Sequence, residues 1–266
     1  MKLIFLSAGL PMLLATAAWA DFSYQESTRV TGGMMMQSGG AAPKPQIYIT
    51  YVKGNRMARI SSEHGQITDL DKETITNVNY ANKTYSVTTF AQMKAMIARM
   101  GAGKNEPGAA NISSHETGKT RTIGKVTAKE TVLTVKLASS EIDTDVWLAP
   151  MVPGYDEVRQ FQQRMAQKMG SAGANGIQKT VQEAAIALTR ANGVPMLRTA
   201  SIRGGMPEGG GGKSVLETST ELTALSSAAV DSSKFDIPAG FQKKEVGMVG
   251  TPPRVPQSPQ SKPAHQ

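Results

Sequence analysis

The residues of this sequence that could do chemistry are few and scattered. The chain holds three histidines, His64, His115 and His265, and no cysteine. A metal site gathers several His, Cys or carboxylate ligands at fixed spacing, and a catalytic triad needs an ordered histidine beside a nucleophile. Neither pattern occurs in the sequence. The histidines are therefore interpreted as surface residues, and the sequence predicts no metal site, no catalytic residue and no enzyme.

Two further segments imitate ligand sites. Residues 209–214 (GGGGKS) resemble a phosphate-binding loop, but Pro207 stands where that motif needs its first glycine. The motif also needs a helix after it, whereas 215–218 has the composition of a strand. The acidic turn at 69–73 lacks the loop and the number of oxygen ligands that calcium requires. We therefore expect no nucleotide, metal or other cofactor.

What remains is apolar patterning, which predicts three amphipathic helices. A capping box at Thr89 and Gln92 begins the first helix, which Gly101 ends. Two more are predicted, with apolar stripes over 155–169 and 177–188, and the last of them ends at Asn192-Gly193. The apolar face of the first helix consists of Phe90, Met93, Ile97 and Met100.

Short runs of alternating residues between turn signals predict a sheet. The class is therefore α+β and mostly antiparallel β, with loops at 32–45 and 102–119. Two interpretations of the apolar surface stay open: the helices fill the sheet face and complete a core, or they cover it in part and leave an apolar pocket. The predicted strands are 22–31, a meander over 46–90, 120–126, 129–137, 143–148, 196–203 and 214–225.

The first residues have the pattern of a secretory signal peptide. Lys2 precedes an apolar run over 3–14, and Ala18-Trp19-Ala20 is a cleavage site, so we expect cleavage after Ala20. An uncleaved anchor or a buried strand is the alternative. Export without cysteine favours the periplasm, with the extracellular space as the second choice. The predicted organisation is a signal peptide at 1–20, a β-rich domain at 21–246, and a disordered proline-rich tail at 247–266.

The charge of the chain limits its partners. The formal net charge is +8 and aromatic residues make up 5% of the sequence. A nucleic-acid surface needs clustered Lys and Arg, whereas the basic residues here are scattered, so we expect no nucleic-acid partner. A solvated basic surface is the first interpretation, and peripheral contact with anionic lipid headgroups is the second.

Five short motifs resemble a family of exported bacterial proteins. They are YVKGNRMARI at 51–60, ITDLD at 67–71, KTY at 83–85, DVWLAP at 145–150 and FDIPAGF at 235–241. Together they resemble domain-of-unknown-function family 4412, in the LolA-like lipoprotein-carrier superfamily, over about 22–244 of this chain. The resemblance implies a curved antiparallel sheet, an incomplete barrel, with about three helices over its concave face. In characterised members of the superfamily, an apolar cavity holds acyl chains of lipids or lipoproteins.

Together these observations predict an exported periplasmic protein that binds a lipid, a lipoprotein acyl chain or another hydrophobic ligand without catalysis. The alternative is a structural or protein-interaction module of the cell envelope. The ligand, the partner and the oligomeric state stay open. The residues expected to line the hydrophobic site are Phe90, Met93, Ile97, Met100, Leu133, Val135, Val146 and Leu148.

Overall fold

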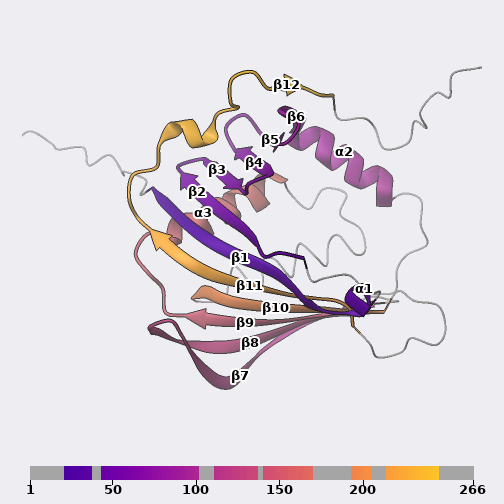
Figure 1. Cartoon of the computed structure of the whole chain (residues 1–266), viewed down its shortest axis with the longest axis vertical. Coiled ribbons are helices and arrows are strands. Elements are labelled where there is room, and N and C mark those ends of the chain that lie inside the picture. The colour runs from indigo at the N-terminus through magenta and orange to yellow at the C-terminus, as the bar shows by residue number, and fades with distance from the viewer. Residues whose placement is uncertain are drawn as a thin grey trace, which may run out of the picture.

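One large sheet dominates the fold (Figure 1). The computed structural model describes residues 21–37, 43–101, 111–136, 140–169, 193–204 and 214–245. The predicted signal peptide, the helix at 177–188 and the tail at 247–266 lie outside these residues. The strands are β1 (Phe22–Gly32), β2 (Gln46–Lys53), β3 (Arg56–Ile60), β4 (His64–Asp69), β5 (Thr74–Asn79), β6 (Thr84–Thr89), β7 (Asn111–Ile123), β8 (Val126–Lys136), β9 (Ser140–Ala149), β10 (Val194–Gly204), β11 (Ser214–Ser226) and β12 (Gln242–Lys243).

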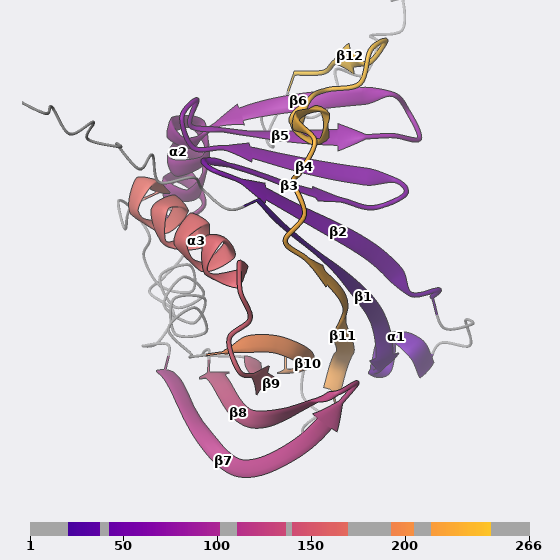
Figure 2. The same ribbon diagram turned by 90° about the vertical axis from the view of Figure 1, so that its left-hand side faces the viewer.

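The sheet is curved and does not close into a barrel (Figure 2). Its order is β12-β6-β5-β4-β3-β2-β1-β11-β10-β9-β8-β7. Neighbouring strands are antiparallel except β12 and β6, which are parallel. The class predicted from the sequence is therefore confirmed at the level of a mostly antiparallel, curved and open sheet.

Two helices of more than one turn lie on the concave side of the sheet within the described residues, α2 (Phe90–Gly101) and α3 (Tyr155–Met169) (Figure 2). The capping box forms as predicted: the Thr89 amide donates to Gln92 Oε1 at 2.9 Å, and the Gln92 amide donates to Thr89 Oγ1 at 3.1 Å. The structure therefore has two of the expected three helices within the described residues, and the third prediction, at 177–188, lies outside them.

Parts of two segments expected to be loops have regular structure. Strand β7 occupies much of the predicted loop at 102–119, and it pairs with β8 from Asn111 to Ile123. Its register shifts between Glu116 and Thr120, next to Gly118 at φ +76°. Within the predicted loop at 32–45, Met34–Gln37 forms a single helical turn, α1. In both places the backbone is held by hydrogen bonds that apolar periodicity does not signal.

The segment 227–244, here called the C-terminal strap, crosses the outer face of the sheet after β11 (Figure 1). It contains a 3-10 turn, η1 (Ser232–Phe235), and ends in β12, which pairs with the edge strand β6. Asp21 anchors its beginning, because Asp21 Oδ2 accepts from the Val230 amide at 2.7 Å and from Lys53 Nζ at 3.0 Å. The strap covers an outer cluster formed by Ala58, Ile67, Val78, Val230 and Phe235.

Replacing Phe235 with alanine is expected to lower the free energy of unfolding by about 3 kcal/mol, because the ring is 6% exposed and its removal leaves a cavity. The Arg56 guanidinium, 4.8 Å from the ring centre, also loses its aromatic partner. The measurement is denaturant unfolding of the purified protein. Ile237→Ala is the control, since Ile237 is 37% exposed in the same strap and should change stability by less than about 0.5 kcal/mol. Equal effects would contradict a docked strap.

Candidate functional site

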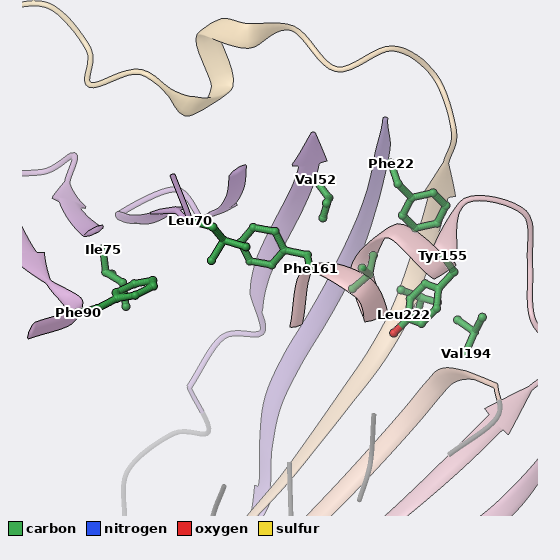
Figure 3. Close-up of a cluster of buried hydrophobic side chains, with 10 residues drawn as sticks. Phe22, Val52, Leu70, Ile75, Phe90, Tyr155, Phe161, Val194 and Leu222 are labelled. Carbon is green, nitrogen blue, oxygen red and sulfur yellow. The ribbon is translucent and has the colours of Figure 1, made fainter. Parts of the chain in front are cut away.

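The concave face of the sheet carries the main buried cluster of the described residues (Figure 3). Its members come from both halves of the sheet and from both helices. Phe161 and Val158 of α3 are fully buried, which seats this helix directly on β1 and β2. The cluster consists of Phe22, Val52, Leu70, Ile75, Phe90, Tyr155, Val158, Phe161, Val194 and Leu222.

Methionines make up most of the half-buried side chains that pack against this cluster in the described part of the chain. Of the eight half-buried apolar side chains that pack against it within the described residues, six are methionines. They come from the sheet, from both helices and from the segments that connect them. Methionine is unbranched and polarisable, so it adapts its shape to what it contacts. The six residues, here called the methionine ring, are Met57, Met93, Met151, Met165, Met169 and Met196.

The four predicted site residues on α2 divide into two pairs. Phe90 is 1% exposed and belongs to the core cluster, while Met93 is half-buried against it. The side chains of Ile97 and Met100 lie outside the described part of the structure. The structure thus brings Phe90 and Met93 onto the concave face, next to α3.

The four predicted residues on β8 and β9 lie farther along the same sheet. Leu133 and Val135 are buried in a separate small cluster with Ile112 and Ile142. Val146 is buried opposite Thr131, and Leu148 is half-buried. The pairing registers place these inward residues on the same side of the sheet as the core cluster. The six predicted residues whose side chains the structure describes therefore lie on the concave side, but Phe90 and Met93 pack in the core cluster whereas Leu133 and Val135 form the separate small cluster.

Two tyrosines mark the polar limit of the core cluster. The rings of Tyr24 and Tyr155 have centroids 6.3 Å apart, and Phe22 meets Tyr155 edge to face at 5.9 Å. Burial raises the pKa of both phenols above the ordinary tyrosine value. Both side chains therefore stay neutral over the physiological pH range, and they add no charge to the apolar side of the face.

Beyond the tyrosines lies a charge cluster that the sequence did not reveal. The Glu26 carboxylate on β1 is buried, yet it accepts a hydrogen bond from Arg198 Nη2 at 2.5 Å. Arg59 Nη2 lies 3.6 Å from its other oxygen. The Arg59 guanidinium also stacks on Tyr48, with Cζ 3.7 Å from the ring centre. Glu26 and Arg198 are 172 positions apart in the chain, so only the folded sheet brings them together.

A hollow of about 510 Å³ opens beside this cluster on β2 to β6. Most of the residues that line it have polar side chains. Gln66 Nε2 donates to Asn77 Oδ1 at 3.2 Å across two of these strands. We call this hollow the polar groove; its lining residues include Tyr48, Arg59, His64, Gln66, Asn77, Asn79, Ser86, Lys244 and Glu245.

The residues considered for catalysis or metal binding have local roles. His64 is exposed, with Nε2 4.0 Å from Glu63, and His115 is exposed on β7. Asp69 accepts from the amides of Asp71 and Lys72 at 3.0 and 2.9 Å, so its carboxylate closes the turn. Within the described residues no group of three or more His, Cys, Asp or Glu side chains could hold a metal ion.

The comparisons with known proteins give no family and no relative from which a function of this site could be inferred. No protein-family model matches the chain, and a search of curated proteins finds no match. None of the helices in the described ranges has the length and hydrophobicity needed to cross a bilayer.

Proposed function

We propose that the protein is an exported carrier that binds a lipid or another hydrophobic ligand on the concave face of its sheet, without catalysis. The observation that carries this proposal is the methionine ring. A core that has only to be stable is best filled by side chains with defined shapes, and flexible methionines specify it poorly. A surface that must repack around a ligand gains from them.

The ligand would enter between the sheet and the helices. Two exposed polar contacts connect α2, α3 and the turn before β5: Lys94 Nζ donates to the Lys168 carbonyl at 2.8 Å, and Lys168 Nζ pairs with Glu73 at 3.1 Å. Exposed pairs of this kind are worth at most about 1 kcal/mol each. Helix α3 is also held to the sheet by a part-buried hydrogen bond from Arg164 Nη2 to the Gly54 carbonyl at 3.2 Å. Burial of an acyl chain contributes about 0.8 kcal/mol per methylene. A chain of a dozen methylenes therefore supplies about 10 kcal/mol to displace α2 and replace its contacts.

The proposed family is domain-of-unknown-function family 4412 of the LolA-like superfamily. The curved, open antiparallel sheet with helices on its concave side supports this proposal, because the resemblance implies that arrangement. The periplasm remains the proposed location, with the peptide at 1–20 as its export signal.

The first experiment asks whether the protein carries a ligand. The full protein is purified from its host, extracted with organic solvent, and the extract is analysed by mass spectrometry. The delipidated protein is then titrated with a fluorescent fatty acid. We expect a co-purified amphiphile and saturable binding.

A matched pair of variants places that binding on the concave face. Met93→Gln introduces an amide next to the core cluster, and unpaired burial of such a group costs about 1–3 kcal/mol. It is therefore expected to weaken fatty-acid binding about tenfold. Met96→Gln makes the same change on the same helix at a side chain that is 39% exposed, and it should bind like the parent. Folding of both variants is checked by circular dichroism.

The proposal fails if the extract contains no amphiphile and the folded, delipidated protein binds no fatty acid. That result would favour the alternative, a protein-interaction module of the envelope. Its available surface would be the edge strand β7, whose side chains are mostly exposed and which pairs, within the described strands, with β8 alone.

A further inference from the structure

The inward side chains of the central strands change from apolar to charged along the strand direction. Successive inward residues on one strand are about 7 Å apart, so the apolar and charged ends are separated by about two such steps. From the helix-covered end outward, the inward residues are Phe22, Tyr24 and Glu26 on β1, Val52, Thr50 and Tyr48 on β2, and Met57 and Arg59 on β3.

The charged end carries an excess of positive charge. Arg59 and Arg198 share one carboxylate, since Glu26 is the only described Asp or Glu within 4 Å of either guanidinium. The polar groove adds Lys244 and Glu245, one charge of each sign. Among the described residues, three cations thus face two carboxylates, and one positive charge is left over at this end of the face.

The guanidinium of Arg59 lines the groove and is held on one side by an aromatic ring. One face of its guanidinium is stacked on Tyr48, which fixes its plane. Its contact with Glu26, at 3.6 Å, is an ion pair longer than a hydrogen bond, and the described residues accept no hydrogen bond from it. The side chain is 41% exposed and lines the groove. Its N–H edges are therefore available for a planar, bidentate contact with a carboxylate or phosphate.

We propose that the polar groove binds the anionic head group, a carboxylate or a phosphate, of an amphiphile whose tail lies within the methionine ring. This inference rests on the proposed function and specifies its ligand class. Arg59 makes the head-group contact. Gln66, directly opposite Arg59 on β4, is the nearest further polar partner, while Asn77, Ser86 and Lys244 line the groove farther from it.

The test compares ligands that share a tail and differ in the head. The full, delipidated protein is titrated with a fluorescent fatty acid, its methyl ester and the matching alkyl phosphate. We expect the two anions to bind at least about tenfold more tightly than the ester. Raising the salt concentration should reduce that preference without weakening the binding of the ester.

Arg59→Gln is expected to remove the preference for anions, so that the fatty acid and the alkyl phosphate bind about as tightly as the methyl ester. Arg29→Gln is the matched control, because Arg29 lies on β1 but on the outer face, with a side chain that is 53% exposed. It should keep the preference. Because the comparison of head groups also works on the parent protein, the inference remains testable even if Arg59→Gln does not fold.

Each remaining outcome has one meaning. Equal affinities for acid and ester in the parent protein would overturn the head-group inference and leave the hydrophobic carrier standing. Absence of binding by all three ligands would overturn the carrier and the inference together. Inorganic phosphate serves as the separate arm: if it competes with the alkyl phosphate at the same concentration, the groove is a site for free anions and the inference is wrong.

Discussion

Replacing Phe161 with alanine is expected to lower the free energy of unfolding by about 4 kcal/mol. The ring is fully buried at the centre of the concave cluster, between α3 and the sheet. Its removal therefore takes away both the burial of the ring and the filling of the space it occupied. For a protein of this size the melting temperature should fall by about 8–16 °C. Thermal and denaturant unfolding measure the effect.

The control for this variant lies on the same helix. Gln162→Ala changes an exposed residue of α3 and should leave stability within about 0.5 kcal/mol of the parent. If Phe161→Ala were as harmless as Gln162→Ala, α3 could not be a docked part of the core. That result would also remove the apolar half of the proposed binding face.

Replacing Gly154 with alanine is expected to destabilise the protein by about 3 kcal/mol. This glycine precedes α3 at φ +88°, in the left-handed region, where a non-glycine residue costs about 1–2 kcal/mol. A Cβ at this position would also lie 2.6 Å from Cδ2 of Phe22. Phe22 is 1% exposed, so its ring has no free space to move into.

Gly124→Ala separates these two causes. Gly124, in the turn between β7 and β8, has φ +61°, but an added Cβ would meet no atom within 4 Å. Its replacement should cost only about 1–2 kcal/mol of conformational strain. Denaturant unfolding of both variants gives the difference, which measures the clash with Phe22. Equal losses would show that Phe22 yields easily, and that the start of α3 is not tightly packed.

Much of the sheet could be predicted because its residues alternate. On β2, Thr50 and Val52 face the concave side while Tyr51 faces the outer cluster, and the sequence shows this period of two directly. Helix α2 could be predicted equally well, because the capping box at Thr89 and Gln92 marks its first turn.

Strand β7 and the strap could not be predicted in the same way. Most side chains of β7 are exposed, so its sequence carries no apolar period, and its structure follows from pairing with β8. In the strap, three apolar residues, Val230, Phe235 and Phe241, are spread over 12 positions without a helical or extended period. Their docking depends on an outer surface that exists only after β2 to β6 have paired.

In the candidate site, too, one part could be predicted from the sequence and another could not. Met93 was identified because helical spacing places it on the apolar stripe of α2. The cluster of Glu26, Arg59 and Arg198 was missed, because its members come from three strands distant in sequence and each alone has the character of a surface charge. The one signal in the sequence was Glu26, which follows Phe22 and Tyr24 at alternate positions of β1 and therefore had to share their inward face.

The placement of β1 beside β11 has a consequence for the order of folding. Gln25 and Thr223, whose side chains form a hydrogen bond across this pair, are separated by 198 positions. During synthesis, strands β2 to β6 can assemble on one side of β1 as soon as they emerge, while its other side waits until almost the whole domain has been made. Pairing over such a sequence distance is slow, because a long loop must close before its contacts form. The nascent chain should therefore remain incompletely folded until β11 has been made. During this interval one edge of β1 stays unpaired and accessible to a chaperone.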